Sequence, residues 1–157
     1  MVTLTCAPDM RLRVPDESLA SALSGLGAGD GRIESGLVFM PNRVNSWDKA
    51  AEELVDAFAL TQTAIEVSAP VVYLVRSRDL LGRSDPLNAA VATGLLGAAR
   101  SVAFEGRRRE AYASVLAWDE SVLWPDVVET IKTLIASRAA LGQPTVIGTE
   151  HLGALLP

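Results

Sequence analysis

The chain has little of several residue types on which metal sites and disulfides depend. Its 157 residues include one cysteine, Cys6, and one histidine, His151. One thiol cannot form an intrachain disulfide, and with one imidazole it supplies too few ligands for a zinc site. We therefore expect no bound metal, and this cysteine usage is consistent with a reducing cytoplasm.

Charge and hydropathy exclude two further classes of protein. Fourteen basic residues stand against nineteen acidic ones, and most of the basic residues are scattered. We therefore expect no surface that follows a phosphate backbone and no nucleic-acid partner. No uninterrupted apolar run approaches the length of about 20 residues that spans a bilayer, and no charged-then-apolar leader opens the chain. These absences predict a soluble cytoplasmic protein without a membrane segment.

One basic cluster interrupts this scattered distribution. Arg107, Arg108 and Arg109 are consecutive, with Glu105 and Glu110 close on either side. Because cations favour the C-terminal end of a helix, we expect this run to cap a helix and to balance its neighbours in a solvated turn.

What the sequence has in quantity is aliphatic residues. Hydrophobic residues make up 49% of the chain, enough for one domain with a real core. The expected strands are Val2–Cys6, Met10–Val14, Gly36–Met40, Pro70–Val75, Tyr112–Ala117 and Thr145–Ile147. The expected helices are Glu17–Leu26, Ser46–Val67, one beginning at Pro86, and Pro125–Ala139. This alternation predicts one α/β domain over residues 1–157, a three-layer sandwich around a mostly parallel sheet.

The glycine-rich segment 25–31 invites a nucleotide-binding interpretation. A dinucleotide fingerprint must follow a strand and open a helix, so that the helix N-terminus meets the pyrophosphate. Here the glycines follow a helix and precede a strand. We therefore expect a flexible turn there, and no cofactor-binding loop in this chain.

The helix that begins at Pro86 is the most distinctive segment. Asp85 is a good N-cap, and proline fits the first helical position. Apolar residues cover nearly the whole circumference, which predicts a helix buried on almost all sides. Gly94 and Gly97 remove bulk at helical spacing and permit close approach, either by the rest of the domain or by another subunit. On the preceding helix, Leu54, Phe58, Thr61 and Ile65 form an apolar stripe.

From about Gly36 to Gly153 the order of segments resembles the short-chain dehydrogenase/reductase family, particularly its beta-ketoacyl-carrier-protein reductases. The segments are GLVFMPN, the helix from Ser46, PVVYLVRS, GLLGAARSVAFE, AYASVLA and LGQPTVIGTEHLG. The resemblance implies a Rossmann-like fold. Since only 35 residues precede Gly36, it also implies a shortened nucleotide-binding half.

The departures from the family pattern fall on its catalytic positions. The resemblance places Asn88 at the catalytic tyrosine and Ala92 at the lysine, with Ser77 near the serine and Glu53 near the asparagine that holds a relay water. An amide and a methyl group can neither protonate an alkoxide nor tune a proton donor. The resemblance therefore implies a chain without catalytic activity of its own.

In this family the two long helices pair with their counterparts in a neighbouring subunit. The resemblance places such an interface at Leu54, Phe58, Thr61, Ala90, Gly94, Gly97, Ala98 and Phe104. It implies a non-catalytic subunit in a heterodimer or heterotetramer with an active, NADPH-dependent ketoreductase of fatty-acid or polyketide biosynthesis. An acyl carrier protein would be reached through that complex.

Two alternatives stay open. One is a small-molecule enzyme or binder that uses the remnant cleft, with Arg76, Ser77, Asp79 or Asn88 in new roles. The other is a self-associating structural protein without a ligand.

Overall fold

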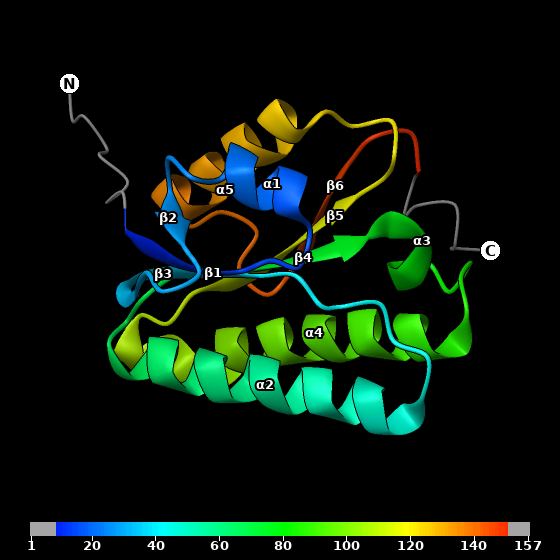
Figure 1. Ribbon diagram of the computed structural model, residues 1–157. Coiled ribbons are helices and arrows are strands. Elements are labelled where there is room, and N and C mark those ends of the chain that lie inside the picture. Colours follow the sequence, from blue (N-terminus) through cyan, green and yellow to red (C-terminus); the bar gives the residue numbers. More distant parts are fainter. Residues whose placement is uncertain (1–8, 151–157) are drawn as a thin grey trace.

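A six-stranded sheet forms the centre of the molecule (Figure 1). The computed structural model describes residues 9–150, so the expected strand Val2–Cys6 lies outside the described residues. All neighbouring strands are parallel, in the order β2-β1-β3-β4-β5-β6. The strands are β1 (Met10–Arg13), β2 (Gly27–Ala28), β3 (Arg32–Phe39), β4 (Val71–Arg76), β5 (Ala113–Trp118) and β6 (Pro144–Ile147). The predicted α/β class with a parallel sheet is confirmed.

The helices connect these strands and begin where the capping residues indicate. They are α1 (Glu17–Ala22), α2 (Trp47–Glu66), α3 (Ser77–Leu80), α4 (Pro86–Glu105), the 3-10 helix η1 (Gly106–Arg109) and α5 (Trp124–Ser137). Ser46 Oγ accepts a hydrogen bond from the Lys49 N–H at 3.2 Å, and the Asp85 carboxylate accepts one from the Asn88 N–H at 3.0 Å. Both predicted N-caps are therefore present.

Element boundaries differ from the expectation at two places. Helix α1 ends four residues before Leu26, and β3 begins four residues before Gly36. In the early part of β3, exposed Arg32 and Glu34 alternate with half-buried residues. A prediction based on a continuous apolar run misses a strand start of this kind.

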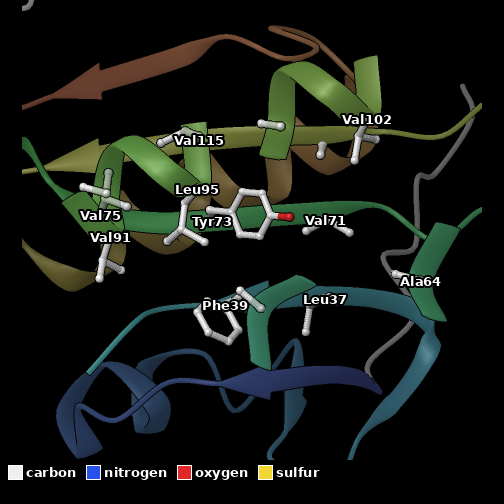
Figure 2. Packing of buried hydrophobic residues seen from close by; sticks show 14 of the residues in the cluster. Leu37, Phe39, Ala64, Val71, Tyr73, Val75, Val91, Leu95, Val102 and Val115 are labelled. Atoms are coloured by element: carbon white, nitrogen blue, oxygen red, sulfur yellow. The ribbon is translucent and has the colours of Figure 1, made fainter. Parts of the chain in front are cut away.

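The helices form two layers, one on each face of the sheet. Helices α2 and α4 lie side by side on one face, and α1 and α5 cover the other (Figure 1). Strand residues alternate between the two cores: Phe39 and Tyr73 face α2 and α4, whereas Val38 and Leu74 face α1 and α5. Figure 2 shows the first of these cores, in which α4 places Val91, Leu95 and Val102 against the strands.

The strands that follow β1 in the chain are added to the sheet on opposite sides of it. Strand β2 lies outside β1, and β3 lies on its other side, which places a topological switch point between β1 and β3. From β3 onward each connection steps one strand in the same direction. Because α5 covers the opposite face from α2 and α4, the β5–α5–β6 connection has the opposite hand to the two before it.

The segment expected to be a flexible turn contributes an edge strand instead. Residues 27 and 28 pair with β1, and the Met10 N–H donates to the Leu26 carbonyl at 2.9 Å. A Cβ at Gly27 or Gly31 would collide with the Met10 carbonyl. The glycines therefore permit close packing of two backbones. The expected turn is present on both sides of Gly27–Ala28, but the segment is held against β1.

Helix α4 is less buried than its composition predicts. Phe104 is 78% exposed, and Gly97 and Arg100 are also exposed. The sheet covers one side of α4 and α2 lies beside it, so its remaining side faces solvent. Together with η1 it is the one helix within residues 9–150 long and apolar enough to cross a bilayer by length and composition alone, a test that a core helix also passes.

Candidate functional site

Two adjoining cavities lie at the carboxyl end of the sheet, where open α/β folds bind ligands. The first, of about 210 Å³, lies near the ends of β1, β3 and β4 and is lined by Asn88 and Ala92 among others. The second, of about 280 Å³, lies near the ends of β4 and β5. Arg43, Arg76 and Asp79 line both cavities, so we describe them together as the carboxyl-edge cleft.

Asn88 uses its carboxamide to hold the loop between β3 and α2. The Val44 N–H donates to Asn88 Oδ1, and Asn88 Nδ2 donates to the Val44 carbonyl, both at 3.1 Å. The same Nδ2 also donates to the Asp85 carboxylate. Asn88 is 6% exposed and Ala92 is 2% exposed. Asn88 and Ala92 thus line the same cavity, where the Asn88 carboxamide is bonded to the loop and Ala92 contributes only a buried methyl group.

Glu53 lies outside the cleft and joins the ends of β1 and β3. Its carboxylate accepts hydrogen bonds from Arg13 at 2.8 Å and from the Asn42 backbone and side chain at 3.0 and 2.6 Å. Burial raises the pKa of Glu53, but these bonds together outweigh burial and lower it. Arg13 also binds Asp56 at 3.1 Å and lies 4.8 Å from the Phe39 ring centroid. Protein side chains therefore fill the space beside the switch point.

The turn between β1 and α1 carries a negative charge. It contains Val14, Pro15 and Asp16 and no glycine. The Asp16 carboxylate accepts a hydrogen bond from the Leu19 N–H at 2.9 Å. In a dinucleotide-binding fold the pyrophosphate occupies this helix start, and here a carboxylate occupies it.

Most of the charged groups in the cleft are paired. Arg43 bridges Asp79 at 2.6 Å and Asp85 at 3.1 Å. The backbone N–H of Asn88, followed by its side chain, lowers the pKa of Asp85.

Asp119, which the sequence analysis did not identify, holds the segment after β6. It accepts hydrogen bonds from the hydroxyl and N–H of Ser121 and from the N–H groups of Thr149 and Glu150. The Ser121 hydroxyl is the largest cause of a pKa far below the ordinary value. A signal for this role was present in the sequence, since an aspartate two residues before a serine at a strand end is typical of an Asx turn.

Three buried donors near the cleft make no hydrogen bond to any described residue. They are Arg76 Nε, Ser77 Oγ and Trp118 Nε1. Arg76 and Trp118 line the second cavity, and the guanidinium lies 5.4 Å from the centroid of the indole. Ser77 lines neither cavity, although it is fully buried at the start of α3.

A larger groove, of about 650 Å³, follows the outer face of α2 and α4. Phe58 and Gly97 line it at an exposed surface, and Phe58 is 43% exposed. A Cβ at Gly97 would meet no atom within 4 Å, so that side of the helix is open. We call this face, with exposed Phe104 and half-buried Ala90 and Ala98, the outer helix face.

Three of the predicted interface residues also make contacts within the chain. A Cβ at Gly94 would lie 2.8 Å from Leu54 Cδ2, so these two residues pack between the helices. Thr61 is 4% exposed, and its hydroxyl lies 2.6 Å from the Tyr73 hydroxyl. Burial raises the pKa of Tyr73 to about 12. Leu54, Gly94 and Thr61 thus contribute to the packing of α2 against α4 and the sheet. Thr61 and Gly94 also line the groove, and the part of these three residues in an interface stays a prediction.

Within residues 9–150 no three His, Cys, Asp or Glu side chains are arranged to hold a metal ion. Comparison with known proteins adds no identification: no family model matches the chain, and no curated protein is significantly similar to it. A function is therefore inferred from the geometry of the described residues and from the order of the sequence motifs.

Proposed function

We propose that this chain is a non-catalytic, reductase-like subunit that associates through its outer helix face with an active, NADPH-dependent ketoreductase. The observation that carries the proposal is the face itself, an open groove of about 650 Å³ between two long helices, with Phe104 78% exposed. Exposed aromatic residues around a groove are typical of protein interfaces. Fatty-acid or polyketide biosynthesis, contact with an acyl carrier protein and a cytoplasmic location belong to this proposal through the resemblance.

The topology supports a reductase-like origin. Doubly wound dinucleotide-binding sheets have the order 3-2-1-4-5-6. Within residues 9–150, the order β2-β1-β3-β4-β5-β6 corresponds to this arrangement without its outermost strand and with one strand added at the other edge. The two-residue β2 leaves little of the half that binds the adenosine in such proteins.

The side chains around the switch point support a role without catalysis. The Asn88 carboxamide is hydrogen-bonded to the backbone of Val44, and Ala92 has only a methyl group. The Glu53 carboxylate is bonded to Arg13 and Asn42. The Asp16 carboxylate caps α1 and places a negative charge where a pyrophosphate would need a positive potential. No group is left to protonate a ketone in the position the family uses.

The lack of bulk on the outer helix face supports a helix as the partner. Ala90, Gly97 and Ala98 leave the α4 backbone accessible, so a helix of the partner can approach closely. Phe58 and Phe104 would then provide the anchors that dominate interface energetics.

Co-expression tests this function. We expect the chain to elute from gel filtration with a full-length ketoreductase encoded beside it, with a light-scattering mass equal to the sum of the subunits. Separate elution of the two proteins would contradict the proposal. A homo-oligomer that excludes the reductase would favour a self-associating structural protein.

A second candidate, a small-molecule binder, rests on the three unsatisfied donors near the carboxyl-edge cleft. Leaving a buried donor unpaired costs about 1–3 kcal/mol, and a ligand with acceptor oxygens would recover part of this. A thermal-shift screen of small carboxylates and ketones, with Arg76→Gln as the control variant, separates the two candidates. A hit that Arg76→Gln abolishes favours a binder.

A further inference from the structure

Half of the basic side chains form an ion pair with an acidic residue, and the other half do not. All fourteen lie within residues 9–150, and seven of them form an ion pair: Arg13, Arg32, Arg43, Lys49, Arg76, Arg83 and Lys132. The other seven are Arg11, Arg78, Arg100, Arg107, Arg108, Arg109 and Arg138. Five of these seven, Arg100, Arg107, Arg108, Arg109 and Arg138, lie at the end of the molecule where α4 and α5 terminate. We call these five the arginine end.

The acidic neighbours do not neutralise this end. Glu66, Glu105 and Glu110 are close in sequence or across the groove, but none forms an ion pair within the described chain. Glu105 and Glu110 therefore offset part of the charge of the arginine run without a direct contact to it within the described residues. Five arginines against three glutamates leave a local excess of two positive charges on a protein whose net charge is −5.

The backbone holds Arg138 in place. It adopts φ 50° at the end of α5, and its guanidinium donates to the carbonyls of Glu110 at 2.6 Å and Ser68 at 3.2 Å. Those two carbonyl-bearing residues also have positive φ, of 52° and 57°. A charge anchored by carbonyls keeps its net positive value, and its remaining N–H donors need no rearrangement before they bind an anion.

A hollow of about 390 Å³ lies between Arg138 and Arg107. Its apolar lining comes from Ala103, Ala111, Tyr112 and Leu141. Leu141 is 41% exposed, and Arg100 lies close by, since a Cβ at Gly142 would be 3.4 Å from its Cα. Glu110 also lines the hollow, so Arg107 and Arg138 together with one glutamate flank a small apolar depression.

This combination favours an acidic protein segment over other anions. Single phosphates would use the charge but not the apolar hollow. Nucleic acid needs a longer cationic track, and the interleaved glutamates oppose one. A segment with Asp or Glu residues around one apolar side chain would satisfy both the arginines and the hollow.

We propose that the arginine end is a docking surface for an acidic protein segment that places an apolar side chain between Arg107 and Arg138. Arg109 also lines the groove of the outer helix face, so the two surfaces adjoin, but the hollow between Arg107 and Arg138 lies outside that groove and its occupation does not require a reductase. The chain alone is sufficient to test it.

The test uses fluorescence anisotropy with a fluorescein-labelled peptide of Glu-Glu-Leu repeats. We expect saturable binding at about 50 mM salt that weakens as the salt concentration is raised. The double variant Arg107→Ala with Arg108→Ala should weaken binding about fivefold. Arg78→Ala removes an unpaired arginine at the opposite end, and it should leave binding unchanged.

Several outcomes would overturn the proposal. These are no binding of the peptide, an equal loss in Arg78→Ala, and equal binding of a peptide in which Gln replaces every Glu. Tighter binding of a single-stranded oligonucleotide of the same charge would also overturn it. Circular dichroism confirms that each variant is folded, and Arg107→Lys with Arg108→Lys, which keeps the charge, should retain most of the binding.

Discussion

In the carboxyl-edge cleft, polar groups are bonded to one another within the chain, whereas on the outer helix face apolar groups are exposed to solvent. In the cleft Arg43 is held by two aspartates, and Asn88 is bonded to Val44. On the outer helix face Phe104 contacts solvent, and Gly97 has open space beside it. At the carboxyl end of the sheet two cavities remain, but most of their charged groups are bonded within the chain, whereas the outer helix face presents apolar groups and open space to solvent. A protein that has exchanged catalysis for association would show this contrast.

The two glycines of α4 provide the strongest test of where the inner and outer sides divide. Gly94→Leu would force a side chain against Leu54, because its Cβ alone would lie 2.8 Å from Leu54 Cδ2. We expect a loss of about 3 kcal/mol in the free energy of unfolding, measured with urea. Gly97→Leu, whose Cβ meets no atom, should cause no loss and should raise it by about 0.5–1 kcal/mol, because leucine favours a helix more than glycine does. Equal losses in the two variants would mean that the glycines lie on the same side.

The hydrogen bonds between Asn88 and Val44 should make the next largest contribution to the free energy of unfolding. Asn88→Ala leaves the Val44 N–H and carbonyl without their partner, and we expect a loss of about 2 kcal/mol in unfolding free energy. Asn45→Ala, an exposed asparagine in the same loop, serves as the matched control. If Asn88→Ala were as stable as the wild type, Asn88 would be free for a role in binding.

Asp119 should give the cleft a pH dependence. Its pKa is lower in the folded chain than in the unfolded one, so its stabilisation is fully present above the unfolded pKa of about 3.9 and is lost as the pH falls. We expect Asp119→Asn to cost about 1 kcal/mol at neutral pH and to reduce the loss of stability between about pH 5 and pH 2. Glu120→Gln, at an exposed neighbour, should leave the profile unchanged. An identical profile for Asp119→Asn and the wild type would remove Asp119 from this account.

Adding the tyrosine and lysine of the reductases that the sequence resembles should give no catalytic activity. Asn88→Tyr with Ala92→Lys supplies the side chains, but Asp16 still occupies the start of α1. We expect no reduction of acetoacetyl thioesters. NADPH binding to the wild type and to the variant should be weaker than about 100 μM in a calorimetric titration, equivalent to less than about 5 kcal/mol. Turnover by the double variant would show that the chain binds the cofactor and would contradict this expectation.

The sequence was sufficient for the fold class, the N-caps at Ser46 and Asp85, and most helices, because these depend on local chemistry and hydrophobic pattern. It was not sufficient for the direction in which individual helix residues face. Thr61 and Phe58 belong to the same apolar stripe, yet only Phe58 is exposed. The rotation of α2 is set by its packing against α4 and the sheet. The Asx turn of Asp119 with Ser121 is a local pattern, but the bonds from Asp119 to Thr149 and Glu150 and from Arg138 to Ser68 join segments far apart in sequence, which no local pattern contains.

The association of Gly97→Leu with the reductase tests the central claim most directly. Gly25→Leu is the matched control, because its Cβ also meets no atom within 4 Å but lies outside the outer helix face. We expect both variants to remain folded. The control should co-elute with the reductase, whereas Gly97→Leu should bind it at least about fivefold more weakly, as overpacking of a close helix contact predicts. A Gly97→Leu complex as stable as that of the control would contradict the account.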